Sequence, residues 1–144
     1  MKPTIDHIDI TVNDLKTAEE FYDKLMPLWG FDLNLKRESC EPEDDYRQIE
    51  YVNTSFIFSV VQAAARVQNI RADYESPGAL HHLAFRAKNN AAVDEFYEKL
   101  LSIGAYEVIP PKFYKQYSPD YYAVFFRDPF GIRYEFVYYD ESNR

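Results

Sequence analysis

The sequence is poor in cysteine and in positive charge, and each shortage excludes a class of protein. Cys40 is the only cysteine among the 144 residues, so no disulfide can form within the chain, as is usual in a reducing compartment. Lysine and arginine total 16 against 24 aspartate and glutamate residues, a formal net charge of −8. A chain this acidic does not offer the basic face that nucleic acids or anionic membranes require.

Long apolar runs are also missing. No segment approaches the roughly 20 apolar residues of a membrane-spanning helix, and the first ten residues (MKPTIDHIDI) lack the apolar block of a secretory signal. We therefore expect a cytoplasmic protein that binds neither membrane nor nucleic acid. What the sequence has in abundance is aromatic residues, 17% of the chain, and rings at this density are expected to line a core or a pocket.

An internal repeat is the most informative feature of the chain. A shift of 75 positions aligns residues 7–28 with residues 82–103 without a gap. Chance gives about one or two identities over such a stretch, so six identities indicate one supersecondary unit used twice. The identical pairs are His7/His82, Glu20/Glu95, Phe21/Phe96, Tyr22/Tyr97, Lys24/Lys99 and Leu25/Leu100.

Each copy reads as a strand followed by a helix. Residues 7–12 and 82–87 alternate in polarity, which predicts strands with one apolar face. Cap-type residues at 13–14 and 89–90 then introduce amphipathic helices. Three further strands are expected in each copy, at 31–35, 48–52 and 55–61 in the first, and at 105–109, 121–127 and 132–138 in the second.

The predicted fold class is therefore α+β, with a βαβββ unit written twice. Within a single domain spanning 1–144, we expect module one at about 1–62, a connector at about 63–78 and module two at about 79–140. The acidic stretch 38–45 is expected to be a solvated loop.

Three possible metal ligands are predicted to share the strand face that the helices leave uncovered. His7 and His82 take equivalent places in the two copies, and alternation along 132–138 puts Glu135 on the corresponding face. Two imidazoles and one carboxylate can hold a divalent metal (Fe, Mn, Ni, Co or Zn) while leaving coordination positions open. On the residues alone, the alternative that all three are ordinary half-exposed strand residues stays open.

Three segments resemble the vicinal oxygen chelate superfamily, which includes glyoxalases, extradiol dioxygenases, fosfomycin-resistance thiol transferases and bleomycin-binding proteins. They are HIDITVNDLKTAEEFY at 7–22, its copy HHLAFRAKNNAAVDEFY at 81–97, and YYAVFFRDPFGIRYEF at 121–136. The Asp-Pro-Phe-Gly turn in the third segment is typical of the second module, because proline restricts φ and glycine permits a tight hairpin.

The resemblance implies a cupped eight-stranded mixed sheet with the helices outside and a divalent metal at the bottom of the cup. The ligands carried over are His7, His82 and Glu135, and Glu135 is also a candidate catalytic residue. Ser59 stands where glyoxalase-type members have a fourth ligand, which favours a three-ligand set. The family also implies a small-molecule substrate, a lyase, isomerase, thiol transferase or dioxygenase activity, and a homodimer.

His81 is expected to point away from His82, although a register change of one residue would exchange the two. Alternation predicts that Asp9, Tyr51 and Arg133 look into the cup. Tyr122, with Tyr121 and Asp9 as alternatives, is a candidate for proton transfer.

The segment 109–122 is expected to be an aromatic loop that can act as a lid, and Lys115 and Tyr117 on it are expected to contact substrate. A surface loop or dimer contact explains the same segment equally well. Two rival functions also remain: a metal-free protein that binds a cationic drug, which the acidic charge favours, and a structural partner role through this loop.

Overall fold

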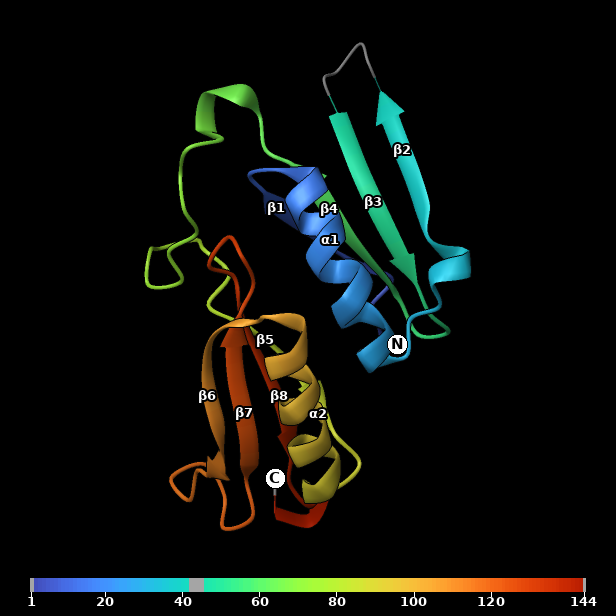
Figure 1. Cartoon of the computed structure of the whole chain (residues 1–144). Coiled ribbons are helices and arrows are strands. Elements are labelled where there is room, and N and C mark those ends of the chain that lie inside the picture. Colours follow the sequence, from blue (N-terminus) through green and yellow to red (C-terminus); the bar gives the residue numbers. More distant parts are fainter. Residues whose placement is uncertain (1, 42–45, 144) are drawn as a thin grey trace. The chain divides into compact units, whose positions relative to one another are not determined.

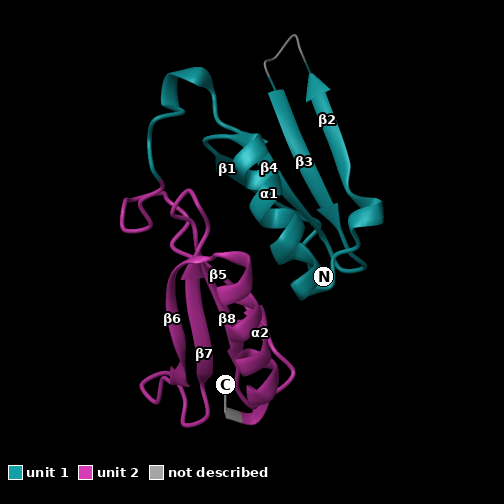
Figure 2. Cartoon of the chain, in the orientation of Figure 1, with its two compact units in different colours: residues 1–71 teal, residues 72–144 magenta. Residues whose placement is uncertain are grey.

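The computed structural model describes residues 2–41 and 46–143, in two compact units that comprise residues 1–71 and 72–144 (Figure 2). Each unit contains a four-stranded mixed sheet and one helix of at least three turns (Figure 1). Among the described residues, no helix is both long enough and apolar enough to cross a membrane.

The first unit has the predicted order of elements. Its strands are β1 (His7–Val12), β2 (Arg37–Glu41), β3 (Tyr46–Val52) and β4 (Ile57–Gln62); its helices are α1 (Leu15–Leu25) and the short 3₁₀ helices η1 (Met26–Trp29), η2 (Leu33–Leu35) and η4 (Ala65–Val67). The strand order is β1-β4-β3-β2, with β1 parallel to β4 and the other pairs antiparallel.

The second unit repeats this arrangement. Its strands are β5 (Leu83–Arg86), β6 (Tyr106–Phe113), β7 (Tyr122–Arg127) and β8 (Arg133–Tyr138); its helices are α2 (Asn90–Ile103) and the 3₁₀ helix η5 (Glu141–Asn143). The strand order β5-β8-β7-β6 again has one parallel pair, β5 with β8. The predicted α+β class with two βαβββ modules is confirmed.

Both long helices begin at the predicted cap residues. The side chain of Asp14 accepts a hydrogen bond from the backbone N–H of Thr17 at 2.8 Å, and that of Asn89 accepts one from Ala92 at 2.8 Å. Each bond satisfies a backbone donor that the first helical turn leaves without a partner, which fixes where the helix starts.

Each helix packs its apolar stripe on one face of its own sheet. In the first unit the Tyr22 ring lies 5.8 Å from the ring of Phe58 on β4. In the second unit the Phe96 ring lies 5.9 Å from that of Phe126 on β7 and 4.5 Å from that of Phe136 on β8. Burial of such rings contributes about 1.5–3 kcal/mol each. Because strand side chains alternate, the polar residues of the strands are directed to the opposite face.

Two predicted boundaries in the first unit are wrong. Residues 33–35 form η2 instead of a strand, and Asp32 caps it by accepting a hydrogen bond from the Asn34 backbone N–H at 2.9 Å. The acidic residues 38–41 belong to β2 instead of a loop, and residues 42–45 of that prediction lie outside the described residues. Pairing with β3 decides the strand here, since an exposed edge strand needs no apolar pattern.

One boundary in the second unit is also wrong. Strand β6 runs to Phe113, so the first part of the expected loop 109–122 is strand. Pro110 and Pro111 are tolerated because β6 is an edge strand whose pairing with β7 shifts register on both sides of Ile109.

The turn before β8 is built around a buried carboxylate. Asp128 Oδ1 accepts hydrogen bonds from the backbone N–H groups of Phe130 at 2.9 Å and Ile132 at 2.8 Å. Gly131 follows with φ of 96°, a conformation that side chains rarely adopt. The turn therefore sets the register of β8 against β7, and with it the position of Glu135.

Candidate functional site

The second unit contains a cavity of about 300 Å³ on the sheet face opposite α2. Its lining comprises two histidines (His81, His82), three aromatic residues (Tyr117, Tyr121, Phe125), Arg133 and Glu135. Aromatic walls with a few convergent polar groups are typical of small-molecule sites.

His82 and Glu135 form the polar centre of this cavity. His82 immediately precedes β5, and Glu135 lies within β8, where it pairs with Ala84. His82 Nε2 lies 3.3 Å from Glu135 Oε2. The Tyr121 hydroxyl donates a hydrogen bond of 2.6 Å to the other carboxylate oxygen, Oε1. Glu135 is only 2% exposed, so its direction is determined by these two neighbours.

Burial shifts the pKa values of both groups toward their neutral forms. It raises the pKa of the Glu135 carboxyl, against the opposing effects of the Tyr121 hydrogen bond and the Arg133 charge. Burial also lowers the pKa of His82, and the neighbouring His81 and Arg133 lower it further. His82 is therefore a neutral imidazole at neutral pH, which is the form that binds metals.

The donor atoms of this pair fit a divalent metal. Two donors at about 2.0–2.2 Å from one ion, at angles of about 90–110°, lie roughly 2.8–3.6 Å from each other. The separation of 3.3 Å between His82 Nε2 and Glu135 Oε2 falls in this range. Within neither unit do the described residues include a group of three His, Cys, Asp or Glu side chains that could hold an ion. The pair alone thus supplies two donors.

The alternation of side chains along a strand predicted that His81 would point away from the cavity, and this prediction is not met. Both histidines line the cavity, with their Nδ1 atoms 2.6 Å apart, and the His81 ring also meets the Tyr74 ring edge-on at 5.1 Å. The reason is that both residues precede the first strand residue, Leu83, and alternation holds only within a strand.

Tyr121, and not Tyr122, is the tyrosine at the site. Tyr122 lies on the helix-covered face, where its hydroxyl donates a 2.7 Å hydrogen bond to Asp94 of α2. That bond, together with burial, raises the pKa of Tyr122 to about 12. The structure therefore places Tyr122 on the face opposite to Glu135, because the register of β7 directs Phe125 and not Val124 to the face of Glu135.

The Tyr121 ring stacks on Tyr139, which in turn stacks on Arg86. The Tyr139 ring lies parallel to the Tyr121 ring, with centroids 5.3 Å apart and planes at 7°. The Arg86 guanidinium carbon lies 3.9 Å from the centroid of Tyr139. This stack restricts the Tyr121 ring and so holds its hydroxyl on Glu135.

The structure places the remaining substrate-contact candidates of the second unit differently. Arg133 and Tyr117 line the cavity. Lys115 is exposed in the turn after β6 and is not among the lining residues.

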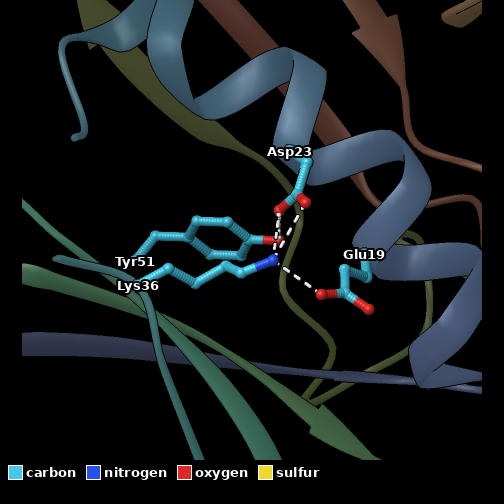
Figure 3. Close-up of polar contacts among 4 residues, drawn as sticks. All are labelled: Glu19, Asp23, Lys36 and Tyr51. Carbon is cyan, nitrogen blue, oxygen red and sulfur yellow. Dashed lines mark hydrogen bonds and ion pairs between the residues drawn. The ribbon is translucent and has the colours of Figure 1, made fainter. Parts of the chain in front are cut away.

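Tyr51 is buried under α1 and does not lie on the open face. Its hydroxyl donates a 2.9 Å hydrogen bond to Asp23 of α1, and Lys36 Nζ donates to both Asp23 and Glu19, at 2.9 Å and 2.6 Å to the nearest oxygens (Figure 3). Tyr51 is 1% exposed and pairs with Phe58, a core residue. The structure therefore places Tyr51 on the helix-covered face, where it contacts α1 through Asp23, instead of on the open face that alternation predicted.

The open face of the first unit carries a second polar group. Asp9 and Glu50 both pair with Ser59 in the sheet, so the three share one face. His7 Nδ1 lies 2.9 Å from Asp6, and this bond and the charge of Asp9 raise the pKa of His7.

Two comparisons follow from the strand register. Ser59 pairs with Asp9 as Glu135 pairs with Ala84, so Ser59 does stand in the place equivalent to Glu135. Sequence reasoning missed Glu50, which occupies the face assigned to Tyr51. The polar side chain of Glu50 in an otherwise alternating strand could have identified it as the residue on the open face. The assignment of that face was wrong by one residue, which placed Tyr51 there instead.

Paired βαβββ modules with an imidazole and a carboxylate on the open sheet face define a known class of protein. Residues 4–136 match the family model of the Glyoxalase/Bleomycin resistance protein/Dioxygenase superfamily. The chain belongs to this superfamily.

Solved structures show the same fold. A protein from Bacillus halodurans, provisionally described as a glyoxalase, is 29% identical with a TM-score of 0.70, over 92% of this chain and 93% of that chain. The fosfomycin resistance protein FosX from Listeria monocytogenes is 16% identical with a TM-score of 0.71, over 100% and 99% of the two chains. The likeness to FosX shows the fold alone. Among curated proteins, none matches the chain.

Proposed function

We propose that this protein is a metal-dependent enzyme acting on a small molecule, with His82 and Glu135 as metal ligands. The observation that carries the proposal is the separation of 3.3 Å between a neutral imidazole nitrogen and a buried carboxylate oxygen in an aromatic cavity. The choice of His7 as a further ligand stays a prediction from the sequence, in which the repeat places it at the position equivalent to His82.

The residues of the cavity have distinct tasks in this proposal. A bound divalent ion would supply open coordination positions that polarise a substrate oxygen. Glu135 presents Oε2 to the ligand position, while Tyr121 occupies Oε1. Burial and the Glu135 carboxylate hold the pKa of Tyr121 above its usual value, so its hydroxyl stays protonated and acts as a hydrogen-bond donor at neutral pH. Phe125 and Tyr117 line the cavity beside these groups.

A metal-free binding protein is the second candidate function. The aromatic share of the cavity lining supports it, because Tyr117, Tyr121 and Phe125 offer ring faces that can hold a flat molecule without a metal.

Metal analysis distinguishes the two candidates. We expect the purified protein, loaded in turn with Mn(II), Co(II), Ni(II), Fe(II) and Zn(II) and then desalted, to retain one of these at about one ion per chain. His82→Gln and Glu135→Gln are expected to lose it, whereas His81→Gln, a matched imidazole in the same cavity, is expected to keep it. If the unsubstituted protein retains no metal, this result contradicts the proposed metal-dependent enzyme and favours the metal-free binding protein.

If metal is retained, three assays separate the reaction types: oxygen uptake with catechols, isomerisation of a hemithioacetal, and addition of a thiol to an epoxide. We also propose a cytoplasmic homodimer, on the family resemblance, which sedimentation analysis of the oligomeric state and cell fractionation would test.

A further inference from the structure

Arg133 is a cation that faces the cavity and forms no ion pair with the described residues of the second unit, although its charge acts on the Glu135 carboxylate in the same cavity. Its guanidinium carbon lies 4.7 Å from the centroid of Phe125 and 5.3 Å from that of Tyr74. Among the described residues of the second unit, no carboxylate lies within ion-pair distance of it, although acidic residues outnumber basic ones by 24 to 16 in the chain.

Two other basic residues differ from Arg133 in that each forms an ion pair. Arg127 also lies over Tyr74, at 4.9 Å, but its Nε is paired with Glu107 at 2.9 Å. Lys36 in the first unit is held by two acids. The N–H groups of Arg133 are therefore available to donate hydrogen bonds to a ligand. Two rings hold the guanidinium in one orientation, so little side-chain conformational entropy is lost when a ligand binds.

The space around Arg133 suits a small flat ligand. Arg133 and Phe125 line both the cavity of about 300 Å³ and an adjoining one of about 180 Å³. The larger volume lies at the lower end of the range for ligand sites, and the smaller one lies below it. The rings of Tyr117 and Tyr121, with centroids 5.1 Å apart, form a wall that favours a ring over an aliphatic chain.

We propose that the cavity binds an aromatic carboxylate, with Arg133 on the carboxylate and the ring against Phe125 and Tyr121. This assigns a substrate class to the proposed enzyme, and it rests on the same cavity. A planar guanidinium presents paired N–H donors at the spacing of the two carboxylate oxygens, so it can hold a carboxylate through two parallel hydrogen bonds.

The test uses the full-length protein after removal of metal with a chelator, so that ligand binding is measured independently of the metal. The probes are benzoate and its neutral analogue benzamide, titrated by NMR at low salt. We expect benzoate to bind at least roughly tenfold more tightly than benzamide.

Two variants assign the effect to Arg133. Arg133→Gln is expected to weaken benzoate binding roughly tenfold while leaving benzamide binding unchanged, and Arg133→Lys to give an intermediate affinity. Arg66→Gln removes the same charge from the exposed η4 in the first unit and serves as the matched control. Circular dichroism checks that each variant is folded.

The outcomes separate this inference from the proposed function. Equal binding of benzoate and benzamide, or equal losses in the two glutamine variants, would each overturn the inference, whatever the metal content. Selective benzoate binding by a protein that retains no metal would support the inference and contradict the proposed enzyme.

Discussion

The burial of Tyr51 under α1 leads to a quantitative prediction for the Tyr51→Phe variant. This substitution removes one hydroxyl, which donates a 2.9 Å hydrogen bond to Asp23, and leaves the ring packed at 1% exposure. A hydrogen bond to a charged group contributes about 1.5–3 kcal/mol. The Asp23 side chain is 33% exposed and keeps Lys36 as a partner, so water and Lys36 recover part of the loss. We expect a destabilisation of about 1 kcal/mol.

Urea unfolding at pH 7, followed by circular dichroism, measures this loss. With a slope of about 1.5–3 kcal/mol per molar urea, the midpoint should fall by roughly 0.3–0.7 M. Tyr106→Phe is the matched control: Tyr106 is 49% exposed on edge strand β6, and its variant should stay within about 0.5 kcal/mol of the unsubstituted protein. Adding Lys36→Met to Tyr51→Phe should give a non-additive result, because both side chains bind Asp23.

Metal retention and benzoate binding should not change in Tyr51→Phe. An unchanged urea midpoint accompanied by weaker benzoate or metal binding would refute the structural role and return Tyr51 to the functional site. A loss of both stability and binding in Tyr106→Phe as well would show that the assays do not distinguish the two roles.

Three further predictions concern the second unit. Tyr122→Phe should lower the free energy of unfolding by about 0.5 kcal/mol at pH 7, a value reduced for solvent exposure. The pKa of Tyr122 is raised from 10.0 to about 12 in the folded state. In alkaline unfolding experiments the difference between the two proteins should therefore be present below pH 10 and disappear as the pH rises toward 12. Tyr139→Leu removes the ring stacked on Tyr121 and should weaken metal binding by roughly threefold to tenfold, measured by competition with a chelator. An unchanged metal affinity would show that the stacked ring does not position the Tyr121 hydroxyl. Asp128→Ala removes the acceptor of two backbone hydrogen bonds in a buried turn and should cost roughly 3 kcal/mol in urea unfolding; a loss below 1 kcal/mol would contradict the role of this turn.

The sequence was sufficient to predict the repeated βαβββ unit and the starts of both long helices. These features depend on interactions between residues close in the chain: the side chains of Asp14 and Asn89 accept from the backbone three residues on, and each apolar stripe recurs within one helix. A gapless match between residues 7–28 and 82–103 then implies two copies of the same packing.

Only the tertiary structure decided which residues of the strands face the candidate site. Tyr51 was assigned to the face that Glu50 occupies, and Tyr122 was chosen where Tyr121 is the residue that contacts Glu135. Both errors are of one residue. Side chains alternate with a period of two, so a single step in register reverses every assignment along a strand, and that register depends on pairing with strands distant in sequence. Arg133 shows the same dependence, because only the folded second unit shows that none of its described carboxylates lies within ion-pair distance of the guanidinium.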